Sequence, residues 1–135
     1  MRLPPETQGK RWLAQAGQDL DAASVLLRSG HRNLACFHAQ QAAEKAVKAF
    51  LYSQGLEEVW GHSVASLLRD AASHHAAFEE LRAEGAALDK FYIPTRYPNG
   101  LPDGLPQDAY TETEATDAIA RAERIIETVK QHASR

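Results

Sequence analysis

The sequence predicts an all-α fold, an antiparallel up-and-down bundle of four to five helices with a long Pro/Gly-rich loop before the last helix. Apolar residues recur at three- and four-residue steps in several segments, which is the period of an amphipathic helix. The alternation of apolar and polar residues that marks a half-buried strand is almost missing. Turn-forming residues gather in one stretch, residues 92–108, so the loop can be placed between helices.

The first two predicted helices span residues 6–28 and 32–54. Pro4 and Pro5 precede the first, where prolines are tolerated, and Gly30 follows it as a stop signal. The second is rich in alanine, a strong helix former, and Gly55 ends it. Because only a short link joins them, the two helices are expected to pack antiparallel. Their apolar faces are formed by Trp12, Ala16, Leu20, Ala23 and Leu27 and by Ala39, Ala43, Ala46, Val47 and Phe50.

Two shorter helices are predicted over residues 63–73 and 76–91. Gly85 is expected to weaken the second of them locally, since glycine is a poor helix former. Their apolar faces consist of Val64, Leu67, Leu68, Ala71 and Ala72 and of Phe78, Leu81, Leu88 and Phe91.

Residues 92–108 are predicted to form a loop, and the last helix is predicted to begin near Thr111. The loop contains the turn signals Asn99-Gly100 and Asp103-Gly104, and loops of this length are often functional. Thr111 and Glu114 have the spacing of a capping box, which starts a helix. The loop prolines are Pro94, Pro98, Pro102 and Pro106, and the apolar stripe of the last helix is Ala115, Ala118, Ile119, Ala122, Ile125, Ile126 and Val129.

Length and composition favour a single soluble domain over residues 1–135. The net charge of -3 gives no strongly basic surface of the kind that binds nucleic-acid duplexes. The lone cysteine, Cys36, is expected to be buried near the alanine face, and a chain without a disulfide fits a reducing compartment. No apolar run approaches the roughly 18 residues of a membrane span, and the N-terminal residues lack the apolar core of a signal peptide. We therefore expect a cytoplasmic protein without a membrane partner.

A polar stripe runs along the second predicted helix. His38, Gln41, Lys45 and Lys48 are spaced by three, four and three residues and are expected to project from one side, opposite the alanine face. An imidazole, an amide and two ammonium groups on one face are suited to hold phosphate oxygens. The alternative is that the stripe simply faces water, as most charged stripes do.

The loop segment 92–100 places Arg96 between Tyr92 and Tyr97. The arginine fork suits phosphate, and aromatic rings stack on bases. The alternative is that the two tyrosines pin the loop on the bundle while Arg96 caps a carboxylate or a helix end.

Other kinds of site have weaker support in the sequence. The amide groups of residues 61–63 open a helix and are of a kind that attracts anions, but capping by Ser63 or His62 is the simpler interpretation. None of the six histidines forms a His-x-x-x-His pair, and with one cysteine the sequence predicts no metal site.

Three stretches of the sequence resemble the HEPN family, the higher eukaryotes and prokaryotes nucleotide-binding domain. Residues 35–51 are similar to the signature second helix of that family. The run Gly61-His62-Ser63-Val64 followed by Leu67-Leu68 resembles the start of its next helix, and Thr95-Arg96-Tyr97-Pro98 resembles its loop before the last helix. The stretches occur in the family's order and frame most of the chain.

The resemblance implies a compact bundle that pairs as a homodimer. Many prokaryotic HEPN proteins are encoded beside, or fused to, a minimal nucleotidyltransferase, and such pairs often act as toxin–antitoxin systems. Some members are proposed to bind nucleotides, and others are metal-independent ribonucleases that carry an arginine and, after four to six residues, a histidine. After Arg96 the permitted positions hold Leu101, Pro102 and Asp103, so the motif is absent there. The nearest substitute is Arg69 with His74.

The leading hypothesis is a non-catalytic protein that binds ATP or GTP, forms a homodimer and is partnered with a minimal nucleotidyltransferase in a toxin–antitoxin-type pair, without cofactor or metal. The alternatives are a metal-independent endoribonuclease toxin, which would take RNA, and a pure protein-interaction module to which Leu101 and Leu105 contribute. The nucleotide hypothesis requires the stripe and the loop to line a common hollow. It assigns phosphate contacts to Lys45, Lys48 and Arg96, and ligand orientation to His38, Gln41 and Tyr97.

Overall fold

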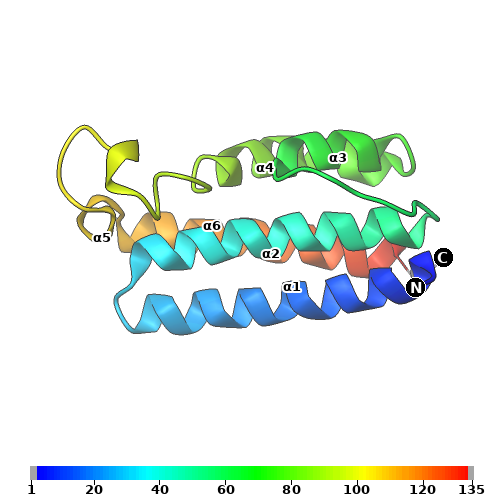
Figure 1. Ribbon diagram of the computed structural model, residues 1–135, viewed down its shortest axis with the longest axis horizontal. Coiled ribbons are helices and arrows are strands. Elements are labelled where there is room, and N and C mark those ends of the chain that lie inside the picture. The colour runs from blue at the N-terminus through cyan, green and yellow to red at the C-terminus, as the bar shows by residue number, and fades with distance from the viewer. Residues whose placement is uncertain (1–2, 134–135) are drawn as a thin grey trace.

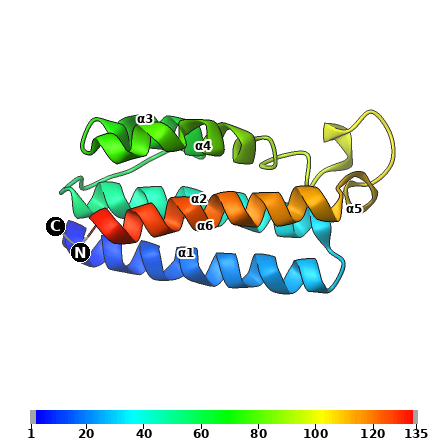
Figure 2. The same cartoon turned by 180° about the vertical axis from the view of Figure 1, so that it is seen from behind.

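The structure, a computed structural model, describes residues 3–133, and this part of the chain contains helices and no strand. The predicted fold class is confirmed. Helix α1 (Pro5–Arg28) and helix α2 (Arg32–Ser53) lie antiparallel, and α6 (Glu112–His132) runs along both of them (Figure 1). Above them, α3 (Val64–Ala72), the 3₁₀ helix η1 (Ala76–Leu81) and α4 (Arg82–Asp89) form a second layer (Figure 2).

Helix α2 is the central element, since it packs against α1, α3, α4, α5 and α6. Small side chains allow this close packing from several directions. The helix is therefore buried almost all round, and the prediction of an alanine face opposed by an open polar face is wrong. Its buried alanines are Ala35, Ala39, Ala42, Ala43, Ala46 and Ala49. Cys36 is buried among them, as expected.

The predicted helix over residues 76–91 is divided into η1 and α4. The 3₁₀ segment is capped at its start by His75, whose Nδ1 accepts the Ala77 N–H at 3.1 Å. Gly85 lies within α4 where it passes α3: a Cβ added there would lie 2.7 Å from Leu68 Cδ1 and 3.0 Å from the Ala65 nitrogen. Glycine at this position therefore serves the close approach of two helices.

Residues 92–110 lie at one end of the bundle, beside the turn between α1 and α2, and the start of α1 and the end of α6 lie at the other (Figure 1). The predicted loop contains two short elements, η2 (Pro98–Gly100) and α5 (Pro106–Ala109), so the helix count exceeds the prediction. The capping box of Thr111 and Glu114 is present at the start of α6, as predicted. No helix within residues 3–133 is long and apolar enough to cross a membrane.

Candidate functional site

Lys45 of α2 lies at the contact between α1 and α2, where it pairs with Asp19 of α1. Its Nζ lies 2.6 Å from Oδ2 of Asp19, and the amide of Gln15 donates to the other oxygen of that carboxylate at 3.2 Å. Both members of the ion pair are largely covered, with 23% of the Lys45 side chain and 11% of the Asp19 side chain exposed. Most of the Lys45 charge is thus neutralised within the protein.

Lys48 is buried in a second ion pair. Its Nζ lies 3.1 Å from Oε2 of Glu44, one helical turn earlier, and also lies over the ring of Trp12 at 5.4 Å from the centroid. The exposed fractions of the Lys48 and Glu44 side chains are 7% and 4%. Lys48 therefore offers no free ammonium group to a ligand.

The remaining two stripe residues are also turned inward in part. Gln41 donates to Gln40 at 2.9 Å and to Glu44 at 3.3 Å. The Nδ1 atom of His38 is buried without a hydrogen-bond partner among the described residues. Burial lowers the pKa of His38; nearby Asp19 raises it and Lys45 lowers it further, both less strongly. The stripe is consequently a row of partly or fully buried side chains that make polar contacts inside the fold. This differs from both the solvated face and the open row of cations considered from the sequence.

A hollow of about 430 Å³ nevertheless opens beside Lys45. It is lined by Gln8, Arg11, Trp12, Gln15 and Lys45. Arg11 is exposed and donates to the side chain of Gln8 at 3.3 Å, and within residues 3–133 no carboxylate neutralises its charge. The sequence reasoning missed Arg11, although Gln8, Arg11 and Gln15 have the spacing of one helix face.

Arg96 occupies a different place, an aromatic cluster that consists of Phe37, Tyr92 and Tyr97. Its guanidinium carbon lies 4.3 Å, 4.9 Å and 5.2 Å from the three ring centroids. Its Nε and one terminal nitrogen donate to the Tyr92 carbonyl at 2.9 and 2.7 Å. The loop is also tied to α2, because the side-chain amide of Asn33 donates to the Thr95 carbonyl at 2.9 Å. Arg96 thus holds its own loop through three rings and a carbonyl, whereas the alternative interpretation of the sequence expected it to cap a carboxylate or a helix end.

His62 contacts both the aromatic cluster and Glu44, the ion-pair partner of Lys48. Its ring stacks on Tyr92 with centroids 5.1 Å apart, and its Nδ1 lies 3.4 Å from Oε2 of Glu44. The His62 side chain is 63% exposed while Glu44 is buried. A buried carboxylate therefore holds one nitrogen of an imidazole whose other edge is open to solvent.

The stripe and Arg96 are not brought into one hollow. Lys45 lines the α1–α2 hollow, and Arg96 is absent from its lining. The two regions still adjoin: Glu44 contacts Lys48 on one side and His62 on the other, and the His38 ring lies edge-on to Phe37 of the cluster with centroids 5.3 Å apart.

The start of α3 is occupied by the protein's own carboxylate. Asp89 accepts the N–H groups of Val64 at 2.7 Å and Ala65 at 3.1 Å, and also the Ser63 hydroxyl at 2.8 Å. Ser63 in turn caps the Ser66 N–H at 3.1 Å. The capping interpretation is confirmed, and this helix end has no amide left for an external anion.

Arg69 and His74, the substitute ribonuclease pair, are exposed residues in α3 and in the turn that follows it. Neither side chain takes part in a hydrogen bond, an ion pair or a ring contact within the described residues. In the same part of the chain, no group of three or more His, Cys, Asp or Glu side chains is placed to hold a metal ion.

Comparison with known proteins decides the family. The model of the HEPN domain matches residues 10–132. This chain belongs to the HEPN family. A relative from Methanocaldococcus jannaschii, named "Putative toxin MJ1304", is 29% identical over 130 residues, which cover 90% of this chain and 85% of that protein.

Solved structures agree with the HEPN assignment. The crystal structure of TT1696 from Thermus thermophilus has a TM-score of 0.88 and 39% sequence identity, and the match covers 93% of this chain and 98% of that chain. ST0689, an archaeal HEPN homologue, has a TM-score of 0.77 and 38% identity over 93% and 97% of the two chains. An HEPN domain protein from Thermotoga maritima has a TM-score of 0.72 and 36% sequence identity, and the match covers 93% of this chain and 98% of that chain.

Proposed function

We propose that this HEPN protein binds a nucleotide in the hollow between α1 and α2, as the toxin-like member of a two-protein pair. The observation that carries the binding proposal is the guanidinium of Arg11, which no carboxylate within residues 3–133 neutralises and which lies beside Trp12 in a hollow of about 430 Å³. The pairing with a second protein rests on similarity to the relative named as a toxin.

The chemistry of the hollow suits a phosphate joined to an aromatic base. Arg11 supplies a fork that matches two phosphate oxygens. The side chain of Trp12 supplies an aromatic surface, and bases stack on such surfaces whatever their identity. Gln8 and Gln15 add amide groups that both donate and accept. Of the two lysines assigned from the sequence, this proposal keeps Lys45 as a secondary contact, because its charge is already shared with Asp19.

Titration calorimetry with ATP and with GTP tests the proposal. We expect binding that Arg11→Ala weakens roughly tenfold or more, since a charge-assisted contact contributes about 1.5–3 kcal/mol. Lys45→Ala is expected to weaken binding less. Arg28→Ala is the matched control, because Arg28 is an exposed arginine at the far end of the same helix.

Arg96→Ala separates the hollow from the aromatic cluster. If the hollow is the site, this variant binds as the natural protein does. If Arg96→Ala abolished nucleotide binding and Arg11→Ala left the affinity unchanged, the binding site would be the aromatic cluster and not the hollow. Absence of ATP and GTP binding would remove the nucleotide proposal altogether.

The partners belong to the proposal as well. We infer a homodimer and a minimal nucleotidyltransferase as candidate partners, and several loop side chains offer apolar surface for such contacts. Trp60 is 78% exposed, and Ile93, Tyr97 and Leu105 are each about half exposed. Light scattering of the isolated protein tests the homodimer, and co-purification with a nucleotidyltransferase encoded beside it tests the second partner. A monodisperse monomer that captures no such enzyme would contradict both.

A second candidate function is metal-independent RNA cleavage, which the Glu44–His62 pair favours. An imidazole oriented by a buried carboxylate is the arrangement of a general base, and Arg96 lies on the same Tyr92 ring that His62 stacks on. This pair suits acid–base chemistry better than Arg69 and His74, which have no orienting contact within the described residues.

Expression in a bacterial host tests this second candidate. Growth arrest that His62→Ala relieves, and that Arg69→Ala and His74→Ala leave intact, would support it. Cleavage of an RNA oligonucleotide in the presence of EDTA would confirm the metal independence. A protein that neither arrests growth nor cleaves RNA would leave nucleotide binding as the only proposed activity.

A further inference from the structure

A second hollow lies on the opposite side of α1, away from the residues proposed to hold a nucleotide. It is a groove of about 430 Å³ between α1, the end of α2 and the end of α6. Gly9, Lys10 and Leu13 alternate along the helix with Arg11, Trp12 and Gln15 of the first hollow, so the helical period directs the two sets to different sides. The groove is lined by Glu6, Gly9, Lys10, Leu13, Ala49, Ser53, Lys130 and Ala133.

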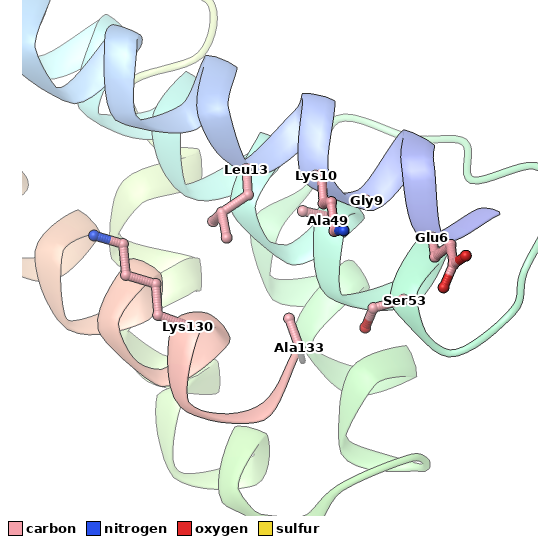
Figure 3. A pocket seen from close by; sticks show the side chains of 8 residues that line it. All are labelled: Glu6, Gly9, Lys10, Leu13, Ala49, Ser53, Lys130 and Ala133. Atoms are coloured by element: carbon pink, nitrogen blue, oxygen red, sulfur yellow. The ribbon is translucent and has the colours of Figure 1, made fainter. Parts of the chain in front are cut away.

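The groove combines an apolar floor with ammonium groups at its edge. Leu13, Ala49 and Ala133 provide the apolar walls (Figure 3). Lys10 and Lys130 are exposed, and within residues 3–133 neither has a carboxylate partner. This differs from Lys45 and Lys48, whose charges are neutralised by Asp19 and Glu44. The two lysines are therefore available to an external anion.

The charges are also distributed unevenly along the groove. Figure 3 shows Lys130 at one end and Glu6 with Ser53 at the other; Leu13 lies between them, and Lys10 lies beside Gly9. An anionic group is favoured toward the Lys130 end and disfavoured beside Glu6. The groove thus has a preferred direction for a ligand that is charged at one end only.

The surroundings fit a small molecule better than a protein surface. A stable protein interface buries about 800 Å² on each partner and has an apolar centre. Within residues 3–133 the large exposed apolar side chains are Leu3, Val25, Trp60, Ile93, Tyr97 and Leu105, and none of them lines the groove. The volume of about 430 Å³ lies within the range of roughly 300–1,000 Å³ that small-molecule sites occupy.

We propose that this groove binds an amphipathic anion, a carboxylate that carries an apolar chain. The chain lies along Leu13, Ala49 and Ala133, and the carboxylate lies toward the Lys130 end, while Lys10 adds positive charge at the middle of the groove. The site is independent of the proposed nucleotide site, because the two share no lining residue.

Titration of the ¹⁵N-labelled protein with sodium decanoate, below its micelle concentration, tests the proposal. We expect amide shifts at Gly9, Leu13, Ser53 and Ala133. Decanol and decyltrimethylammonium have the same chain without the negative charge, and we expect them to bind roughly threefold or more weakly, as an exposed ion pair implies.

The double variant Lys10→Gln/Lys130→Gln is expected to weaken decanoate binding roughly three- to tenfold and to leave decanol binding unchanged. The matched control is Arg28→Gln/Lys90→Gln, which removes two exposed cations from elsewhere on the described surface. The proposal would be overturned if decyltrimethylammonium bound as tightly as decanoate, or if the double variant bound decanoate as the natural protein does. Amide shifts confined to other regions of the protein would also overturn it. Binding of an acidic apolar peptide but not of decanoate would also overturn it, in favour of a protein partner.

Discussion

At the scale of single residues, Glu44 is a buried carboxylate in an alanine-rich helix that three polar side chains contact. Its side chain is 4% exposed and accepts contacts from Lys48, His62 and Gln41. A buried carboxylate that balances a buried ammonium group is costly to remove, because the remaining charge is left without a partner in a poorly hydrated place.

We predict that Glu44→Gln destabilises the protein by about 3 kcal/mol, because it leaves the Lys48 ammonium group buried and unpaired. Urea unfolding at neutral pH measures this change. The double variant Glu44→Gln/Lys48→Met should recover most of the loss, since neither charge is then present. A loss below about 1 kcal/mol in the single variant would show that the pair is hydrated and that its burial matters little.

His38 gives the stability of the protein a pH dependence of known sign. Burial lowers the pKa of His38 below its ordinary value of 6.5, so the unfolded chain takes up this proton more readily than the folded one. Stability is therefore fully present above about pH 6.5 and declines as the pH falls from there through the pKa of the folded state.

We predict that His38→Gln flattens the fall in unfolding free energy between about pH 7.5 and about pH 5, because glutamine binds no proton. Urea unfolding of both proteins across this range measures it. His74→Gln, which removes an exposed imidazole, is the matched control. Parallel pH profiles for the natural protein and His38→Gln would contradict the assignment.

At the scale of the helices, glycines that look alike in the sequence have opposite roles. Gly85 lies in α4, where an added Cβ would lie 3.0 Å from the backbone nitrogen of Ala65 in α3. Gly17 lies in the interior of α1, and a Cβ added there would meet nothing within 4 Å.

We predict that Gly17→Ala stabilises the protein by up to about 1 kcal/mol, the difference in helix propensity between the two residues. Gly85→Ala gains the same propensity but forces α3 and α4 apart, and overpacking costs about 1–3 kcal/mol, so the net effect is destabilising. Thermal unfolding of the two variants measures the difference. Equal effects would show that the two helices separate without cost.

Asp89 is the main link between α4 and the start of α3. It accepts two backbone N–H groups and a hydroxyl, and the side chain of Gln40 also reaches it at 3.4 Å. We predict that Asp89→Asn destabilises the protein by about 1–3 kcal/mol, because an amide nitrogen then faces backbone donors. Circular dichroism during urea unfolding measures this. Ser63→Ala removes the Ser66 cap and one hydroxyl donor to Asp89 but leaves both backbone N–H contacts of Asp89; it should cost about 1 kcal/mol and serves as the comparison.

At the scale of the whole molecule, the sequence is sufficient to predict the bundle but not the site. The apolar periods of α1 and α6 and the Thr111 capping box depend on neighbours within a few residues, so they are visible directly. The polar stripe is recognisable, but its partners are not, because Asp19 lies 26 residues before Lys45 and His62 lies 18 residues after Glu44. Charge pairing across helices depends on the packing of α1 and the loop against α2, which a one-dimensional pattern does not contain.

The same packing divides the molecule into parts of unequal stability. Helix α2 is enclosed by every other α-helix, whereas the layer of α3, η1 and α4 is built from short elements that touch the bundle on one side only (Figures 1 and 2). Local opening is easiest where elements are short and few buried contacts must be broken. Asp89 in this layer holds Ser63, the residue after His62, so opening of the layer would leave His62 held to α2 only through Glu44 and through the Gln40 amide, which donates to the His62 carbonyl at 2.9 Å, among the hydrogen bonds of the described residues.

We predict from this that native-state hydrogen exchange will be slowest at the amides of Ala42 to Leu51. The free energy of opening should be several kcal/mol lower at the amides of Leu67 to Ala72. Low concentrations of urea distinguish the two regions, because the layer should open with a smaller dependence on denaturant than global unfolding shows. Asp89→Asn should accelerate exchange in α3 and leave α2 nearly unaffected. Exchange of both regions with one common free energy would mean that the bundle opens as a single unit and that the layer has no separate opening.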